Sequence, residues 1–307
     1  MLVLGKQHTF SKLELETLQK KFTIDFVEYK EIDSKEVIRE ISSFITKKDK
    51  RLIVLNTQAL VPDELLRYLT KLEQEEGIQY LTIQSFMEKY LHKCYIPSNH
   101  TDISFLEEIK PFNLFERSIK FVIDYAITVI ILILTSPFIL YAIYRIKKES
   151  DGPIFFKQKR LGQNGKEFTC IKFRSMSVDA EKNGAQFATV DDERVYPWGK
   201  TMRETRIDEL PQLWNVLKRD MHLIGPRPER KVWTDEFEKE IPYYNERHIV
   251  KPGLTGWAQV LYPYGANAYD AKQKLMYDLY YIKHWSLWLE IKTIFKTIVV
   301  ILSRKGV

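Results

Sequence analysis

The chain has 307 residues, of which 45% are hydrophobic and 29% are charged. This composition supports a sizeable core, and the length suits two domains. The formal net charge of +6 suits an anionic membrane surface, nucleic acid or a phosphorylated substrate as partner. The two cysteines, Cys94 and Cys170, lie far apart and match no metal-ligand spacing, which argues against a disulfide framework and favours a reducing compartment.

Short apolar runs alternate with helical patterns over the first hundred residues, as in a small parallel sheet with helices packed on it. We predict a soluble, degenerate Rossmann-like α/β domain over residues 1–100. Its only glycines, Gly5 and Gly77, do not form a glycine-rich turn that would cradle a phosphate. A regulatory or dimerisation domain is therefore favoured over a working dinucleotide site. The predicted strands cover residues 2–5, 24–29, 52–56 and 79–83, and the predicted helices cover 11–22, 34–46, 61–76 and 84–92.

A polar connector, predicted over residues 101–116, precedes a stretch from Tyr125 to Tyr144 that contains no charged residue. About 20 apolar residues are enough to cross a bilayer as a helix. Lysine and arginine collect on the cytoplasmic side of membranes, and here they flank both ends of the stretch, which indicates that both ends face the cytosol. The flanking cations are Arg117, Lys120, Arg145, Lys147 and Lys148.

Ser136 and Pro137 interrupt the apolar stretch. Proline removes a backbone donor and clashes with the preceding turn, so it breaks or kinks a helix. The Ser136 hydroxyl is placed to bond a carbonyl freed by the proline. From these residues alone, a re-entrant helix-break-helix over residues 117–148 and a kinked membrane span are equally supported.

The next segment, residues 154–176, predicts a β-hairpin. Its two β-rich runs flank Asn164 and Gly165, a pair that favours tight hairpin turns. Six cations stand against the single acid Glu167, so the hairpin either has a solvated basic face or holds anionic headgroups or a phosphorylated lipid. The cations are Lys157, Lys159, Arg160, Lys166, Lys172 and Arg174.

Two adjacent carboxylates, Asp208 and Glu209, stand at the start of a predicted helix. Pro211 suits a first turn, and Asp208 occupies the predicted N-cap, so the pair lies at the positive end of the helix dipole. Capping is the simplest role for Asp208. One apolar face of the helix is predicted from helical spacing and contains Leu210, Leu213, Trp214, Leu217 and Met221.

Arginines surround the acidic pair. Arg203 and Arg206 precede it, and Arg227 follows between two prolines. Guanidinium groups form paired hydrogen bonds to phosphate oxygens. The two carboxylates either hold Mg²⁺ against a diphosphate, or one of them attacks phosphorus directly. Nearby cations would keep such an aspartate ionised.

From about Phe112 to the C-terminus the chain resembles the bacterial sugar transferases, the monotopic polyprenyl-phosphate phosphoglycosyl transferases. Five blocks in order carry the resemblance, which makes it highly specific. The blocks are the Ser136-Pro137 break, "FFKQKRLGQNGKEFTCIKFRSM", "RETRIDELPQLWNVLKRDMHLIGPRPE", "VKPGLTGWAQV" and "YDLYYIKHWSLWLEIKTIFKT".

The resemblance implies a covalent, two-step transfer. Asp208 would attack the β-phosphate of a UDP-sugar, expel UMP and carry the sugar-phosphate until a polyprenyl phosphate takes it over. Glu209 would assist with Mg²⁺ or proton transfer, and Asp208 and Glu209 would be the metal ligands. Arg203, Arg227 and Lys172 match family positions that contact phosphates.

The resemblance also implies a re-entrant membrane helix and a mainly helical catalytic domain over residues 149–307, with a short β-hairpin and C-terminal interfacial helices. The catalytic domain would face the cytoplasm at the bacterial inner membrane. The implied partners are a UDP-sugar, polyprenyl (undecaprenyl) phosphate and inner-membrane lipid, with a homodimer possible and no nucleic acid. Two rival functions stay open, namely a non-enzymatic membrane scaffold acting through the N-terminal domain and an ordinary glycosyltransferase that releases UDP.

The chain departs from the family pattern after "GWAQV". Many small members carry Asn-Gly-Arg there, whereas this chain reads "LYPYGANAYDA" and offers no arginine for a phosphate contact. This favours the longer, exopolysaccharide-associated members, and with them glucose or galactose ahead of an N-acetylated sugar. Long members often begin with four membrane helices followed by an α/β domain. In this chain we expect the α/β domain without those helices.

Three further features lie outside the acidic pair. Residues 277–296 mix aromatic and basic side chains, which fits an interfacial helix and ordinary core aromatics equally. His222 and His248 are predicted to be packed or hydrogen-bonded and not catalytic. Residues 251–260 predict a turn-rich loop.

Overall fold

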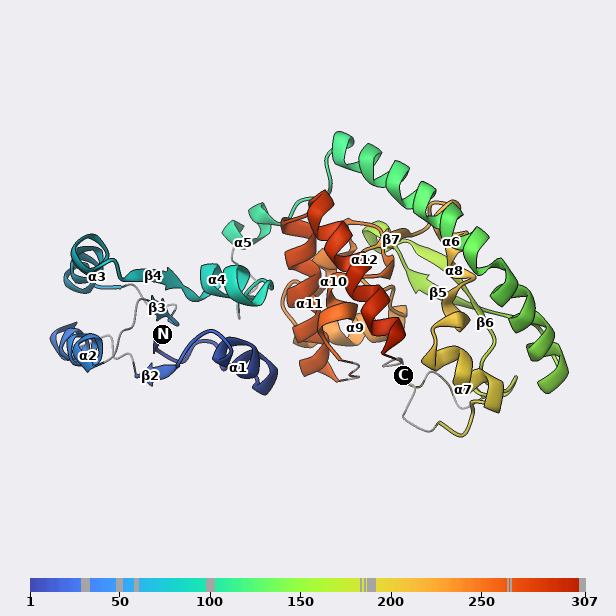
Figure 1. The fold of residues 1–307 in the computed structure, drawn as a ribbon, viewed down its shortest axis with the longest axis horizontal. Coiled ribbons are helices and arrows are strands. Elements are labelled where there is room, and N and C mark those ends of the chain that lie inside the picture. Colours follow the sequence, from blue (N-terminus) through green and yellow to red (C-terminus); the bar gives the residue numbers. More distant parts are fainter. Residues whose placement is uncertain are drawn as a thin grey trace. The chain divides into compact units, whose positions relative to one another are not determined.

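The computed structural model forms two compact units, Met1–Tyr95 and Ile96–Val307, each with its own core (Figure 1). The predicted domain boundaries near residues 100, 116 and 148 stay predictions. The structure describes residues 1–28, 34–47, 52–57, 61–97, 103–182, 184, 186, 192–263, 265 and 267–303.

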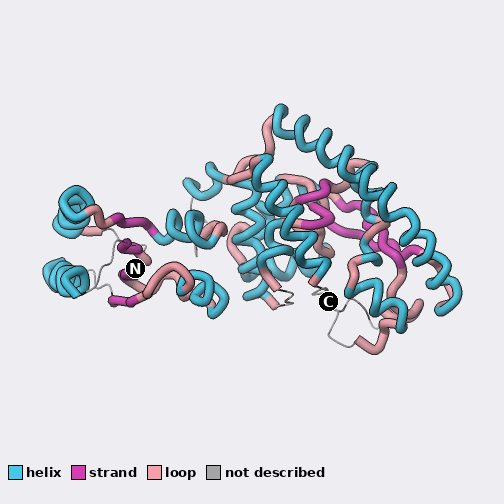
Figure 2. The backbone as a smooth tube through the Cα atoms, in the orientation of Figure 1, coloured by secondary structure: helices cyan, strands magenta, loops and turns pink. Residues whose placement is uncertain are grey.

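The first unit contains the predicted parallel sheet, seen as magenta strands in Figure 2. Its strand order is β2-β1-β3-β4, and all neighbouring strands are parallel. The predicted alternation of strands and helices is thus confirmed, although Tyr29 of the second predicted strand lies outside the described residues. The strands are β1 (Leu2–Leu4), β2 (Asp25–Val27), β3 (Leu52–Leu55) and β4 (Gln79–Thr82).

The helices of the first unit begin and end where local chemistry predicts. A capping box between Ser11 and Glu14 starts α1. Gly77, at φ 66°, ends α3 in the left-handed conformation that glycine adopts without strain. The apolar faces of α2 and α3 pack against β1 and β3, whose residues are buried. The helices are α1 (Lys12–Gln19), α2 (Ser34–Lys47), α3 (Asp63–Glu76), α4 (Ile83–Phe86) and the π-helical turn η1 (Met87–Leu91).

Buried polar side chains gather where β1 and β3 end. Asn56 accepts a hydrogen bond from the His8 backbone (2.8 Å) and donates to the His8 carbonyl (2.9 Å). Glu14 forms a buried ion pair with Lys93 and lies 3.2 Å from the His8 ring. Ligands of parallel sheets usually bind at this edge, and here the chain's own ion pair occupies part of it.

The second unit opens with two helices. The short helix α5 (Ile103–Glu108) falls within the predicted polar connector, as does the start of α6 (Leu114–Glu149). A capping box between Asn113 and Glu116 starts α6. Among the described residues, α6 is the one helix that is long and apolar enough to cross a membrane, by length and composition.

The predicted helix break is wrong for this structure, because α6 is continuous through Pro137. Proline has no N–H for the carbonyl of Ile133, one turn earlier. The Ser136 hydroxyl donates to that carbonyl instead, at 2.8 Å. The predicted capping by Ser136 is therefore present, and it satisfies the carbonyl within an unbroken helix.

One side of α6 is anchored by charge. Lys120 donates to both carboxylate oxygens of Glu290 (3.0 and 3.1 Å), and both side chains are buried. Glu290 belongs to α12 (Leu287–Leu302) and also accepts hydrogen bonds from Tyr281 and Trp285. Much of the remaining surface of α6 is apolar and exposed. Its most exposed large apolar side chains are Leu114, Phe115, Ile133, Leu134 and Leu140.

The predicted hairpin is confirmed. Strands β5 (Phe155–Leu161) and β6 (Glu167–Phe173) pair antiparallel, and both Asn164 and Gly165 have positive φ in the turn. The cations divide between interior and surface. Arg174 is buried and donates to Ser150 and the Pro153 carbonyl, and Arg160 donates to the Pro228 carbonyl. The exposed cations are Lys157, Lys159 and Lys166.

The predicted loop over residues 251–260 is wrong. It forms strand β8 (Gly253–Thr255), which pairs with β7 (His222–Ile224), and then helix α10 (Trp257–Leu261). A Cβ atom on Gly253 would lie 2.0 Å from the backbone nitrogen of Gly225. The glycine therefore permits close approach of two backbones, whereas the sequence pattern suggested tight bends.

The remaining elements of the second unit are helical. In α11 the aromatic side chains of Tyr277 and Tyr281 are buried and belong to the core, whereas Trp288 on α12 is 72% exposed. The predicted core role is thus confirmed for the α11 aromatics, whereas the interfacial role stays a prediction. The elements are α7 (Pro197–Glu204), η3 (Ile207–Glu209), α8 (Gln212–Leu217), α9 (Lys231–Glu240), η4 (Tyr244–Ile249) and α11 (Ala268–Lys283).

The Lys120–Glu290 pair predicts a stability effect. Lys120→Met leaves the buried Glu290 carboxylate without its cation, and we expect unfolding in detergent to become easier by about 3 to 5 kcal/mol. Replacing Glu290 by Gln in the same chain removes the unpaired charge and should restore part of the loss. Urea titration followed by tryptophan fluorescence measures both variants, and equal stability of Lys120→Met and the parent would contradict the anchoring role.

Candidate active site

Three separate segments bring the acidic pair and its cations together. Lys172 lies on β6, Asp208 and Glu209 lie in the 3₁₀ turn η3, and Arg227 lies in the loop after β7. Asn215 on α8 fixes β6 beside this turn: its amide donates to the Thr169 carbonyl (2.8 Å), and its oxygen accepts from the Ile171 backbone (3.1 Å).

The predicted helix cap is wrong. Asp208 lies inside η3, and α8 begins later, at Gln212, with Pro211 at its N-cap and no side-chain capping bond. Arg206 precedes the turn with φ 59°, a left-handed conformation that interrupts the helical path. The predicted apolar face also includes one exposed member, because Trp214 is 53% exposed.

Glu209 is the carboxylate that the cations hold. Its Oε1 atom accepts from Lys172 Nζ (2.7 Å) and Arg227 Nη2 (2.8 Å), and Arg206 Nη1 lies 4.0 Å away. Although burial opposes ionisation, Arg227, Lys172 and Arg206 hold the pKa of this carboxyl well below its usual range. Glu209 is therefore ionised at neutral pH and ties three segments together.

Asp208 has the opposite environment. Its side chain is buried, and among the described residues its Oδ1 atom has no hydrogen-bond partner. Burial and the neighbouring negative charge of Glu209 raise the pKa of Asp208, while Lys172, Arg206 and Arg203 oppose the rise. A poorly solvated carboxylate oxygen of this kind is a stronger nucleophile than one saturated with hydrogen bonds.

The structure brings together five of the predicted residues, and Arg203 is the most loosely held. It lies on α7 and acts on Asp208 through its charge. Ser136 and Pro137 lie apart from this group, within α6. The predictions assigned no role to Asn215, although an amide side chain on the buried face of a helix would have indicated a specific partner.

The carboxylate oxygens of Asp208 and Glu209 are candidate ligands for Mg²⁺. Magnesium usually takes one or two protein carboxylates together with substrate phosphates and water. The buried, unpartnered Oδ1 of Asp208 fits such a ligand, while Oε1 of Glu209 is already held by two cations. No group of three or more His, Cys, Asp and Glu side chains with metal-binding geometry occurs within the described parts of the chain. The pair therefore fits a metal that arrives with a diphosphate.

The chain belongs to the bacterial sugar transferase family. The model of that family matches residues 115–304, which is more than half of the chain and includes the acidic pair, the hairpin and the cations around the acidic pair. The resemblance noted in the sequence is thereby confirmed.

Several curated relatives are named for sugar-phosphate transfer. A UDP-N-acetylgalactosamine-undecaprenyl-phosphate N-acetylgalactosaminephosphotransferase from Aeromonas hydrophila is 50% identical over 188 residues, covering 61% of this chain and 44% of the relative. A UDP-glucose:undecaprenyl-phosphate glucose-1-phosphate transferase from Xanthomonas campestris pv. campestris is 43% identical over 185 residues, covering 59% and 38%. The chain thus spans less than half the length of these two relatives.

A third relative extends further along the chain. An uncharacterized sugar transferase from Haemophilus influenzae (strain ATCC 51907 / DSM 11121 / KW20 / Rd) is 30% identical over 298 residues. The match covers 88% of this chain and 60% of the relative, so it includes part of the first unit.

The two carboxylates predict unequal stability effects. Glu209→Gln removes the partner of Lys172 and Arg227 and should lower the free energy of unfolding at pH 7.5, by about 1 to 3 kcal/mol. Asp208→Asn should lower it less or raise it, because the folded state raises the pKa of Asp208, so ionisation of this group weakens folding as pH rises. Thermal unfolding in detergent at pH 7.5 and 5.5 compares them. The advantage of Asp208→Asn should shrink at the lower pH, where Asp208 takes up a proton.

Proposed function

We propose that the chain transfers a sugar-1-phosphate from a UDP-sugar to undecaprenyl phosphate and releases UMP. The observation that carries the proposal is the difference in environment between the two adjacent carboxylates. Oε1 of Glu209 is held by Lys172 and Arg227, whereas Oδ1 of the adjacent Asp208 has no hydrogen-bond partner among the described residues. The names of the curated relatives supply the class of reaction.

In the first step, an Asp208 carboxylate oxygen attacks the β-phosphorus of the UDP-sugar. A new bond forms between that oxygen and phosphorus, and the bond from phosphorus to the bridging oxygen breaks. UMP leaves with the electron pair on its phosphate. Arg203, Arg227 and Lys172 bind the diphosphate oxygens and offset the charge that collects on the leaving group. The product is an aspartyl-phosphosugar and free UMP.

In the second step, a phosphate oxygen of undecaprenyl phosphate attacks the same phosphorus. The bond between Asp208 and phosphorus breaks, which regenerates the carboxylate and yields undecaprenyl diphosphate sugar. No proton has to move for either bond exchange. The relay lets a water-soluble donor and a membrane-bound acceptor use one site in turn, so two bulky phosphorylated substrates need not bind together.

Magnesium is part of the proposal. Asp208 and Glu209 would hold it, and a bound Mg²⁺ would neutralise charge on the donor's diphosphate. Asp208 would still supply the attacking oxygen, and Glu209 would still keep Lys172 and Arg227 in position.

The membrane arrangement is likewise proposed. The exposed apolar surface of α6 supports insertion into the inner membrane with the catalytic unit on the cytoplasmic side. Cations at both ends of the helix favour a re-entrant course, in which both ends of the continuous helix α6 lie at the cytoplasmic face. The first unit would act as a regulatory or dimerisation domain. The sugar stays open, since relatives named for N-acetylgalactosamine and for glucose both match.

The covalent relay predicts a measurable adduct. Incubation of the detergent-purified chain with Mg²⁺ and a panel of UDP-sugars, without lipid, should add one sugar-phosphate to the intact protein and release UMP. Asp208→Asn should abolish the adduct, and Glu204→Gln, an acid on α7, serves as the matched control that keeps it. Release of UDP would indicate an ordinary glycosyltransferase, and no labelling with any donor would favour a non-enzymatic scaffold.

The raised pKa of Asp208 predicts the pH dependence of labelling. Attack requires the carboxylate, so the rate should be high above the pKa, which the site raises to about 6, and should fall below it. Well below the pKa the fall is about tenfold per pH unit. Single-turnover labelling between pH 5 and 8 by quenched mass spectrometry measures this. A rate that stays constant down to pH 5 would contradict the environment described for Asp208.

A further inference from the structure

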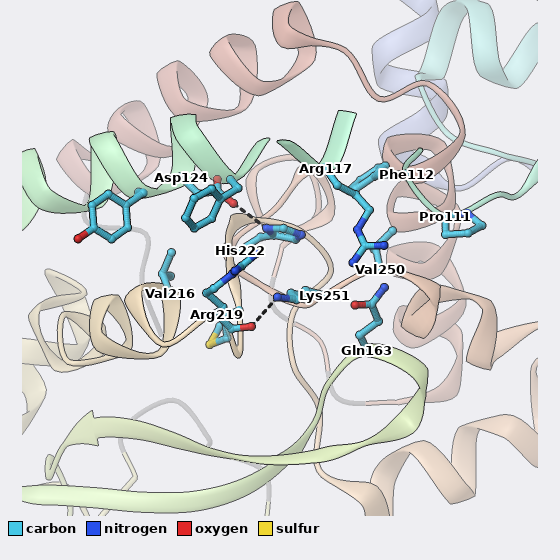
Figure 3. A pocket seen from close by; sticks show the side chains of 13 residues that line it. Pro111, Phe112, Arg117, Asp124, Gln163, Val216, Arg219, His222, Val250 and Lys251 are labelled. Carbon is cyan, nitrogen blue, oxygen red and sulfur yellow. Dashed lines mark hydrogen bonds and ion pairs between the residues drawn. The ribbon is translucent and has the colours of Figure 1, made fainter. Parts of the chain in front are cut away.

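A basic pocket lies in the same unit, apart from the acidic pair. It has a volume of about 130 Å³ and lies between the start of α6, the turn of the hairpin and the segments on either side of β7 and β8 (Figure 3). None of the residues assigned to sugar-phosphate transfer lines it. Its polar lining includes Arg117, Asp124, Arg219, His222 and Lys251.

Three cations face this pocket. Arg117 comes from α6, Arg219 from the turn after α8, and Lys251 from the residues before β8. Within the described residues none of the three forms an ion pair. Burial and the positive charges of Arg219 and Arg117 lower the pKa of Lys251, while the carboxylates of Asp220 and Asp124 oppose the fall. Such an arrangement is stabilised when an anion binds.

The cations are held in place by local contacts. Lys251 Nζ donates to the Arg219 carbonyl at 2.6 Å, drawn as a dashed line in Figure 3. The Arg219 guanidinium lies over the Phe121 ring of α6, 4.4 Å from its centroid. A cation stacked on an aromatic ring keeps its N–H groups available at the ring's edge. The pocket is therefore built before a ligand arrives.

A buried acid–base pair forms one wall. His222 Nδ1 lies 2.6 Å from Asp124 Oδ2, and burial lowers the pKa of His222 to about 4, so its ring is neutral at pH 7. Lys120 lies 3.5 Å from the other Asp124 oxygen and offsets that carboxylate. Asp124 and the neutral imidazole both line the pocket, where three cations outnumber this one carboxylate.

The surroundings of the pocket indicate a lipid in place of a soluble ion. Phe121 and Tyr125 line it from the apolar helix α6, and they are 39% and 50% exposed. Aromatic rings and basic side chains together are typical of the headgroup level of a bilayer, and basic pockets beside membrane helices bind anionic headgroups.

We propose that this pocket binds the phosphate group of a membrane lipid, with its acyl or prenyl chain along Phe121 and Tyr125. Two lipids share this chemistry, an anionic phospholipid of the bilayer and a polyprenyl phosphate. The proposal does not depend on the transfer reaction, because it concerns equilibrium binding at residues outside the acidic pair.

The test measures binding to the purified full chain in detergent by calorimetry, without any UDP-sugar. The probes are dihexanoyl phosphatidylglycerol, farnesyl phosphate, inorganic phosphate and dihexanoyl phosphatidylcholine. The double variant Arg117→Gln/Lys251→Gln should weaken binding of an anionic lipid about tenfold or more, since each cation near a headgroup contributes substantially. Lys147→Gln/Lys148→Gln, at the other end of α6, is the matched control and should bind as the parent does.

The pattern of weakened binding in the double variant distinguishes the two kinds of lipid. Loss for phosphatidylglycerol alone assigns a bilayer lipid, loss for farnesyl phosphate alone assigns a prenyl phosphate, and loss for both supports the shared headgroup chemistry. Unchanged binding in the double variant overturns the proposal. Inorganic phosphate that binds as tightly as the lipids, or phosphatidylcholine that binds equally, also overturns it. Should the double variant unfold, Arg219→Gln, whose side chain is exposed, must show the same direction of change.

Discussion

The attraction between one carboxylate and two cations organises the second unit. Glu209 Oε1 holds Lys172 from the hairpin and Arg227 from the loop after β7, and the three come from segments distant in sequence. Glu209 is buried and its two cations are half-buried, so removing either cation leaves a buried carboxylate with less compensation. The same contacts occupy Glu209 Oε1, whereas Asp208 Oδ1 has no hydrogen-bond partner among the described residues. Two chemically similar neighbours thereby have different environments.

Much of the fold follows from local rules. The capping box at Ser11, the glycine stop at Gly77 and the turn at Asn164 and Gly165 each depend on nearby residues, and all lie where the sequence indicates. The close approach of Gly253 to Gly225 does not follow from local rules, because it depends on two segments meeting in space. A glycine that permits tight packing looks the same in sequence as a glycine that permits a bend.

The candidate site was likewise predictable from the sequence only in part. Adjacent acids surrounded by arginines identify the segment from sequence, and the family resemblance adds the roles proposed for Asp208 and Glu209. Which acid pairs with which cation could not be predicted, since that depends on Lys172 and Arg227 arriving from elsewhere. The pocket beside α6 was also missed. Its cations, Arg117, Arg219 and Lys251, are spread over more than a hundred residues, and each looks unremarkable alone.

Arg206 shows what the turn at Asp208 demands of the backbone. A non-glycine residue in the left-handed region costs about 1 kcal/mol or more, and glycine or asparagine would adopt it with less strain. Either substitute would also remove a guanidinium that lies 4.0 Å from Glu209. At this position, relief of backbone strain and retention of the positive charge require different residues. Any redesign that seeks a more rigid, heat-resistant version of this turn would face that conflict first.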